Sequence, residues 1–215
     1  MRSAKSLVRV GEMATSRIRS LRSIVNSVRG NQNVQIRESC VSRVTIDLLN
    51  VWTQFSRNLY VSCLVGTRRP ISGFIIVNNP CMTVTDAIGR AILHYRPNSQ
   101  PKANGSWHRR DEPNWHDPNV LLTLLIAQNA TIYPDVQAAL SAGYRVFLDL
   151  PVFRNYFGHR NQSTSDATRV SALLYSIQPR KRPSDILLDN PLGRPQCLLL
   201  EWMDELCFTI EFLCS

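Results

Sequence analysis

Apolar residues recur at helical spacing along most of the chain. Between residues 4 and 28, 37 and 65, and 195 and 213 they follow an i, i+3, i+4 pattern. The stripes are Leu7, Val10, Ile18, Leu21, Val25 and Val28; Val44, Leu48, Val51, Phe55, Leu59 and Cys63; and Leu198, Leu199, Trp202, Leu206, Ile210 and Leu213. Such periodicity places the apolar side chains on one face of a helix, which then has to be buried. The pattern therefore predicts three long amphipathic helices.

Shorter helices are predicted between these stretches. They cover 83–95, 118–130, 134–143, 150–161 and 164–178. Thr83 or Thr85 is suited to cap the first of them, and Pro118 and Pro134 each suit a first helical turn. The basic PRKRP cluster at 179–183 is expected to stop the last.

Two segments depart from the helical pattern. Residues 71–78 are short and β-branched, which favours a strand or a buried extended piece. Residues 96–117 are rich in proline, asparagine and charge, and they predict a long loop of the kind that is often functional or mobile. The pattern as a whole predicts an all-α, antiparallel helical bundle. We expect a basic N-terminal helix or arm over 1–33 and one helical domain over 34–215.

The formal net charge is +9, and its distribution changes the picture. Residues 1–30 hold seven basic residues against Glu12 alone, a net +6. Such a segment suits a phosphate backbone, anionic lipid or an acidic partner, and it is also compatible with a solvated helix or an organellar transit peptide. No uncharged apolar run reaches about 18 residues, so we expect no membrane segment. No compact apolar stretch follows the first basic residues, which argues against a secretory signal.

The six cysteines lie apart, without any CxxC pair. Most fall within apolar helical patterns, where a free cysteine behaves as a small hydrophobic residue. A disulfide framework is not expected at this length and spacing. These features predict a reduced, cytoplasmic protein.

The segment DLPVFRNYFGHRN, residues 149–161, carries the most informative chemistry. Asp149 is predicted to be the N-cap of its helix, with Pro151 in the first turn. At about 100° per residue, the polar residues Arg154, Asn155, Gly158 and His159 share one arc. The opposite arc holds Leu150, Val152, Phe153, Tyr156 and Phe157. Because Gly158 costs about 1 kcal/mol of helix propensity relative to alanine, we interpret it as a place of close approach by a backbone or a ligand.

This polar arc suits phosphodiester chemistry. The planar fork of Arg154 matches phosphate oxygens and keeps its charge. The imidazole of His159 can take a proton from one oxygen and return it to another. Asn155 can orient the imidazole or hold a phosphate oxygen. If the ribose 2′-hydroxyl is the nucleophile, neither a metal nor a cofactor is needed.

The hexapeptide RNYFGH resembles the R-N-x-x-x-H signature of HEPN-domain ribonucleases. The resemblance extends as a helical pattern over about 40–213 and implies a HEPN-like bundle. It implies a metal-independent endoribonuclease whose Arg and His residues meet across a homodimer. By this resemblance His159 is the general base, Arg154 stabilises the phosphorane-like charge and Asn155 supports them. The products are a 2′,3′-cyclic phosphate and a 5′-hydroxyl.

Many relatives of this family are toxins or phage-defence effectors, and the resemblance implies such a role here. Some carry a tyrosine two residues after the histidine, which a partner nucleotidylates. Asn161 stands at that position, and the chain holds no nucleotidyltransferase segment, so any antitoxin is expected to be a separate protein. The alternative is a non-catalytic HEPN-like module that binds nucleic acid or protein.

Further RNA contacts are predicted at Trp107, Arg109, Arg110 and Arg160, since aromatic and arginine side chains suit unpaired bases and phosphates. The competing interpretation of the 107–117 loop is a solvated segment pinned by a buried tryptophan. Its residues His108 and His116, with Asp111 or Asp117, match no strong metal signature. A second Arg-Asn pair, Arg57-Asn58, lacks a histidine five positions after its arginine and is interpreted as structural.

Overall fold

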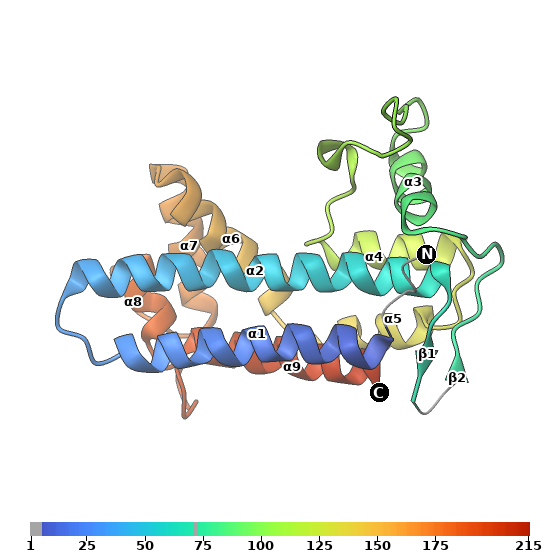
Figure 1. Ribbon diagram of the computed structural model, residues 1–215. Helices are drawn as coiled ribbons and strands as arrows, with labels where there is room; N and C mark the ends of the chain where they lie inside the picture. Colours follow the sequence, from blue (N-terminus) through green and yellow to red (C-terminus); the bar gives the residue numbers. More distant parts are fainter. Residues whose placement is uncertain (1–5, 71–72) are drawn as a thin grey trace. The chain divides into compact units, whose positions relative to one another are not determined.

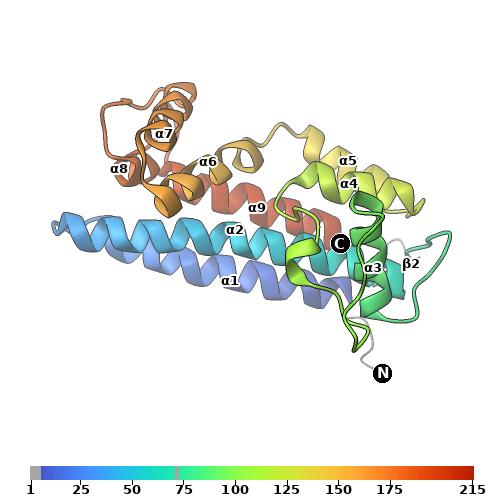
Figure 2. The ribbon, with the colours of Figure 1, turned by 90° about the horizontal axis from the view of Figure 1, so that it is seen from above.

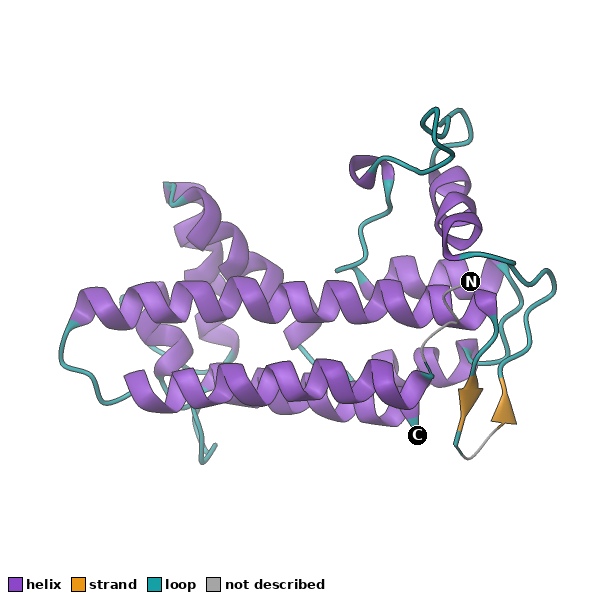
Figure 3. Cartoon of the chain, in the orientation of Figure 1, coloured by secondary structure: helices purple, strands orange, loops and turns teal. Residues whose placement is uncertain are grey.

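A computed structural model describes residues 6–70 and 73–215 and shows a mainly helical protein (Figures 1 and 3). This confirms the predicted all-α class. The helices are α1 (Leu7–Val28), α2 (Val34–Val65), α3 (Val84–Tyr95), α4 (Pro118–Ala127), α5 (Tyr133–Ser141), α6 (Val146–His159), α7 (Gln162–Leu174), α8 (Pro183–Leu188) and α9 (Leu198–Cys214). Strands β1 (Arg68–Arg69) and β2 (Gly73–Phe74) pair antiparallel in the only sheet within the described residues.

The three long amphipathic helices are confirmed as α1, α2 and α9. Every residue of the three predicted apolar stripes is buried. The largest of the fully buried side chains include Trp52 of α2 and Trp202 of α9. Burial of these continuous apolar faces is the main force that holds the helices together.

The chain forms two compact units, each built from several segments. Unit 1 contains the chain up to Ala14, Trp52–Gly143 and Thr209–Ser215. Unit 2 contains Thr15–Val51 and Tyr144–Phe208. Helices α1, α2 and α9 each contribute residues to both units. The division into an arm over 1–33 and a domain over 34–215 stays a prediction, although the apolar stripe of α1 is buried.

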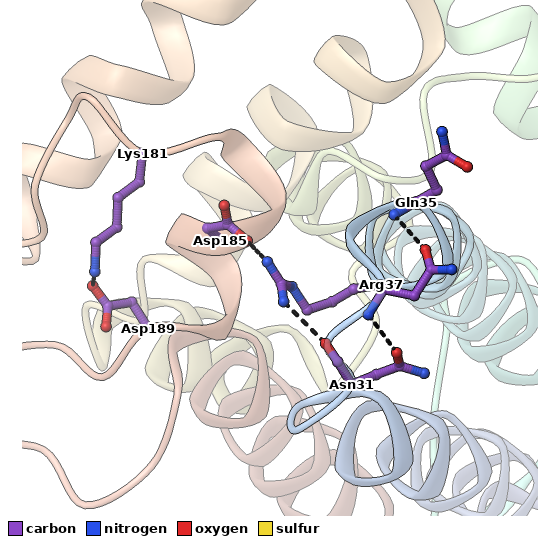
Figure 4. Close-up of polar contacts among 7 residues, drawn as sticks. Asn31, Gln35, Arg37, Lys181, Asp185 and Asp189 are labelled. Carbon is purple, nitrogen blue, oxygen red and sulfur yellow. Dashed lines mark hydrogen bonds and ion pairs between the residues drawn. The ribbon is translucent and has the colours of Figure 1, made fainter.

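In unit 2 the C-terminal part of α1 lies beside α2 and the first part of α9 (Figures 1 and 2). The Arg22 guanidinium of α1 donates to the Leu200 carbonyl at 3.3 Å and also pairs with the Asp204 carboxylate, both on α9. At the start of α2, Arg37 donates to the Asn31 carbonyl at 3.0 Å and to Asp185 of α8 at 2.8 Å (Figure 4). These contacts tie α9 to α1, and α8 to the start of α2 and the turn before it.

The prediction that the PRKRP cluster stops a helix over 164–178 was wrong. Helix α7 ends at Leu174, and Ser176 adopts a left-handed conformation with φ of 56°. That conformation turns the chain out of the helix before the basic cluster is reached. The cluster instead leads into α8, which begins at Pro183, and the Lys181 ammonium lies 2.5 Å from the Asp189 carboxylate (Figure 4).

In unit 1 the predicted cap, loop and extended segment are found. Thr83 caps α3 by accepting from the Asp86 N–H at 3.1 Å. Residues 96–117 form a loop with one short 3-10 turn, η1 (Arg109–Asp111). Of the predicted extended segment at 71–78, residues 71–72 lie outside the described part, while β2 is extended and Ile75 and Val77 after it are buried.

The end of α9 is fastened to β1 and α5 by one arginine. Arg69 donates to the Phe212 carbonyl at 3.0 Å and to the Ser215 carbonyl at 2.9 Å, and it pairs with Asp135 of α5. The first two contacts satisfy carbonyls that a helix end leaves without intrahelical partners. Arg69 is therefore a structural residue.

The cysteines lie inside the fold, where each is buried or half-buried. All six cysteines are free. Burial raises the pKa of the Cys63 and Cys214 thiols to about 12, so both are unreactive at neutral pH. Within residues 6–70 and 73–215, every helix is too short or too polar to cross a lipid bilayer.

Candidate functional site

Helix α6, which carries the RNYFGH hexapeptide, begins earlier than predicted. It starts at Val146, so Asp149 lies in its first turn and is not the N-cap. The N-terminal N–H of Val146 instead donates to the Glu205 carboxylate of α9 at 3.2 Å. A carboxylate from a distant helix thus satisfies the helix end that Asp149 was predicted to cap.

The early start also changes the position of Pro151. The prediction placed it in the first turn, but it lies inside α6. Proline has no N–H to donate along the helix and is unfavourable there by about 3 kcal/mol. The surrounding packing of unit 2 therefore has to hold α6 in place.

A buried hydrogen-bond network supplies that support. The Asp149 carboxylate, 4% exposed, accepts from Arg145 at 2.9 Å and from the Tyr175 hydroxyl at 2.6 Å. The Trp202 indole N–H of α9 donates to the same hydroxyl at 3.1 Å. Burial and the bond to Asp149 raise the pKa of Tyr175, so its hydroxyl stays protonated. The network connects α6, the end of α7 and α9 through fully engaged polar groups.

The two-faced character predicted for α6 is confirmed. Phe153 and Phe157 are buried, and the Phe153 ring stands edge-on to Trp202 with centroids 5.5 Å apart. On the opposite side, four residues are exposed to solvent: Arg154, Asn155, Gly158 and His159. We call these four the α6 polar face. Because the opposite face of α6 is buried, the α6 polar face has to point toward solvent.

On the α6 polar face, Asn155 lies between Arg154 and His159 around the helix axis. The Arg154 Nη1 donates to the Asn155 Oδ1 at 3.4 Å, and His159 follows Asn155 by four positions on the same side of the helix. Arg154 and His159 are separated by about 7.5 Å along the axis and about 140° around it, from ideal helix geometry. They therefore do not converge on one point, and a single α6 offers one guanidinium and one imidazole.

Gly158 lies open on this face. A Cβ at this position would meet only the Arg154 Nη1, at 3.9 Å. No other described group approaches closely enough to require glycine there. The close approach predicted from the sequence is not made by this chain's own described residues.

The residues after α6 have structural contacts. Arg160, a predicted RNA contact, ends α6 in a left-handed conformation with φ of 47°. Its guanidinium pairs with Glu38 of α2 at 3.1 Å while its side chain stays 55% exposed. Asn161 caps α7 by accepting from the Thr164 N–H at 2.9 Å. The position that carries a tyrosine in some HEPN toxins is thus a helix cap here.

The other predicted RNA contacts belong to the 96–117 loop of unit 1. Trp107 lies against Gly89 of α3, so close that a Cβ there would stand 2.6 Å from the indole Nε1. This contact leaves Trp107 half-buried, whereas Arg109 and Arg110 are exposed. Trp107, Arg109 and Arg110 belong to unit 1, whereas Arg160 belongs to unit 2.

The metal ligation considered for the loop finds no support. Across the described residues no cluster of three or more His, Cys, Asp or Glu side chains is placed to hold an ion. Asp111 pairs with Arg96 at 3.2 Å, and Asp117 caps α4 by accepting from the Asn119 N–H at 2.9 Å. Both carboxylates therefore have structural partners.

A pocket that the sequence did not predict lies between α2 and the loop, within unit 1. It has a volume of about 270 Å³ and is lined by Gln54, Arg57, Asn58, Arg109 and Glu112. Gln54, Arg57 and Asn58 share one face of α2, which their i, i+3, i+4 spacing indicates. Glu112 lies 55 positions along the chain from Arg57, and no local pattern connects them. We call this the α2–loop pocket.

Comparison with known proteins leaves these sites to be judged on their geometry. No family model, curated protein or solved structure matches the chain. The α6 polar face is the exposed surface where a guanidinium, an amide and an imidazole occur on one helix. It is the arrangement with the clearest chemistry among the predicted sites.

Proposed function

We propose that the protein is a metal-independent endoribonuclease of the HEPN-like helical class, acting in the cytoplasm with the α6 polar face as its active site. The observation that carries the proposal is the joint exposure of Arg154, Asn155 and His159 on a helix whose other face is buried. The buried hydrogen-bond network around Asp149 holds α6, and with it the α6 polar face, in place.

The proposed reaction uses the RNA's own nucleophile. His159 takes the proton of the ribose 2′-hydroxyl, whose oxygen attacks the adjacent phosphorus. The bond from phosphorus to the 5′-oxygen breaks, and that oxygen receives a proton, which leaves a 2′,3′-cyclic phosphate and a 5′-hydroxyl. Arg154 stabilises the charge on the phosphoryl oxygens, and Asn155 positions its neighbours.

A homodimer would complete the site. One imidazole removes the first proton, and a second group has to protonate the leaving oxygen. A second protomer would supply it from the same helix. Exposed apolar residues on α7, which packs against α6, support such an assembly: Val170 is 63% exposed, and Leu173 and Leu174 are each 58% exposed. Their i, i+3, i+4 spacing gives a continuous apolar strip for a partner to cover.

The resemblance to HEPN ribonucleases supports a cellular role as a toxin or phage-defence effector. RNA cleavage of this kind halts growth, so its activity would need control. We infer that a separate antitoxin or defence-system protein provides it. Asn161, as the cap of α7, offers no tyrosine for nucleotidylation.

The deciding experiment incubates purified protein with total RNA in EDTA. Wild-type protein is expected to cleave RNA, and Arg154→Ala and His159→Ala are each expected to lose about 100-fold or more in rate. Matched controls are Arg43→Ala, whose side chain is 82% exposed on α2, and His94→Ala at the exposed end of α3. Both controls should cleave like wild type.

Three results would contradict the proposal in different ways. Equal cleavage by wild type and both α6 variants would remove the α6 polar face from the mechanism. Loss of cleavage on adding EDTA would exclude the metal-independent reaction. RNA binding without cleavage by any variant would favour the alternative, a non-catalytic nucleic-acid-binding module.

A further inference from the structure

The α2–loop pocket has features that the proposed active site does not use. Its polar groups come from two elements of unit 1, α2 and the loop that contains η1. The α6 polar face belongs to unit 2. None of the five lining residues belongs to the α6 polar face, so binding at the pocket can be tested apart from cleavage.

One wall of the pocket is built around the Glu112 carboxylate. Glu112 accepts from Arg57 Nε at 2.6 Å and from Arg57 Nη2 at 3.1 Å, which is a bidentate pair. The buried Trp115 indole N–H donates to the same carboxylate at 2.9 Å, and the Trp115 ring packs on Tyr60 with centroids 5.4 Å apart. Glu112 thus accepts from three donors and is only 11% exposed. The Arg57 guanidinium compensates its negative charge at the pocket wall.

Three residues of the pocket, Arg109, Arg57 and Asn58, carry hydrogen-bond donors that no described group accepts. Arg109 is exposed and forms no ion pair with any described acid, and its guanidinium carries five N–H donors. Arg57 commits its Nε and Nη2 to Glu112, which leaves its Nη1 outside that pair. Asn58 is half-buried and its side-chain amide has no hydrogen bond within the described residues. Two guanidinium groups against one carboxylate give the pocket a net positive charge.

We propose that the α2–loop pocket binds a phosphate group, carried by an RNA backbone or by a small phosphate compound. A phosphate presents its oxygens in a tetrahedral arrangement, which suits donors from separate elements such as Arg109 on the loop and Arg57 and Asn58 on α2, and arginine is well matched to it. A volume of about 270 Å³ holds a phosphate with its surrounding water or attached sugar. The chain's net charge of +9 favours the approach of such an anion.

The test measures binding of three probes in EDTA: inorganic phosphate, adenosine 5′-monophosphate and single-stranded 2′-O-methyl RNA. The last cannot be cleaved by 2′-hydroxyl attack, so binding is measured without turnover. Arg109→Ala is expected to weaken phosphate binding about tenfold. Asn58→Ala is expected to weaken it about threefold. The matched control is Arg43→Ala, since Arg43 is exposed on α2 but does not line the pocket.

The pattern across probes identifies the source of the phosphate. A tenfold loss for all three probes indicates the RNA backbone, and the salt dependence of RNA binding should then fall by about one unit of slope. A loss for phosphate and the nucleotide alone indicates a small ligand. If Arg109→Ala and Arg43→Ala weaken binding equally, or if Arg109→Ala changes none of the three, the pocket proposal is overturned.

The two proposals fail separately. His159→Ala should bind inorganic phosphate at the pocket as wild type does, whatever happens to cleavage. Wild-type protein that binds phosphate through Arg109 but does not cleave RNA would end the ribonuclease proposal and leave the pocket. Because Arg109 is exposed, its loss should leave the melting temperature of the protein unchanged, and circular dichroism checks this.

Discussion

The dipeptide Arg-Asn occurs twice on helices of this protein, and the two copies meet different surroundings. On α2, Arg57 is 31% exposed and its guanidinium is held by the Glu112 carboxylate at 2.6 Å. On α6, Arg154 is exposed, donates to the neighbouring Asn155 at 3.4 Å and pairs with no acid in the described part of the chain. The first arginine has its charge compensated by a nearly buried acid. The second displays its charge to solvent, where a substrate can take the place of water.

The difference shows that residue type alone does not determine whether an arginine is paired with an acid or open to solvent. A guanidinium in a bidentate pair holds two segments of the chain together, because breaking the pair leaves a poorly solvated carboxylate. A guanidinium on a supported, open face contributes little to stability and remains available to bind phosphate. Stability and activity measurements should therefore separate the two pairs.

The largest effects come from removing each arginine in turn. Arg154→Ala should reduce RNA cleavage about 100-fold and change the free energy of unfolding by less than about 0.5 kcal/mol. Arg57→Ala should lower the free energy of unfolding by about 2 kcal/mol, because Glu112 keeps only the Trp115 N–H as a partner. Urea denaturation and cleavage per folded molecule measure both. Equal stability losses in the two variants would contradict the comparison.

Two helical glycines allow a second test, because one is packed tightly against a side chain and the other is exposed. Gly89→Ala should destabilise the protein by about 1.5 kcal/mol, because the new Cβ would stand 2.6 to 2.9 Å from three atoms of the Trp107 indole. Thermal and urea unfolding measure the loss, and tryptophan fluorescence should report the shift of Trp107. A variant as stable as wild type would show that the indole has room to move.

Gly158→Ala should change the free energy of unfolding in the opposite direction. The new Cβ meets only the Arg154 Nη1 at 3.9 Å, so better helix propensity should raise the free energy of unfolding by about 0.5 to 1 kcal/mol. If the α6 polar face receives RNA or a second protomer closely, cleavage should fall although the protein is more stable. Unchanged cleavage would show that nothing approaches this glycine in the working enzyme.

The smallest effect concerns the carboxylate that holds the start of α6. Burial raises the pKa of Glu205 above its ordinary value of 4.5, and the neighbouring Glu201 adds to the rise. The folded protein then binds more protons than the unfolded chain in the interval above pH 4.5, so stability falls as pH rises through it. Glu205→Gln keeps an oxygen for the Val146 N–H and removes the contribution of Glu205 to this dependence. The fall in melting temperature across this interval should therefore be smaller in the variant than in wild type.

The sequence predicted the long helices well because their apolar periodicity is regular over many turns. All six residues of the α9 stripe, from Leu198 to Leu213, are buried as predicted. The same reasoning correctly placed Phe153 and Phe157 inside and Arg154 and His159 outside on α6. A helix with two distinct faces determines which residues it displays before any partner is known.

Boundaries and partners were decided by tertiary contacts. Asp149 has the residue type of an N-cap, but Glu205 of α9 satisfies the first N–H of α6 and Asp149 is buried against Tyr175 instead. The Arg57–Glu112 pair and its pocket were equally hidden, since hydrogen bonds between distant segments leave no local pattern. The sequence by itself determined the helices and the exposed face of α6, because periodicity acts within a few turns. Only the tertiary structure decided which arginine pairs with an acid, because that depends on where a distant carboxylate comes to lie.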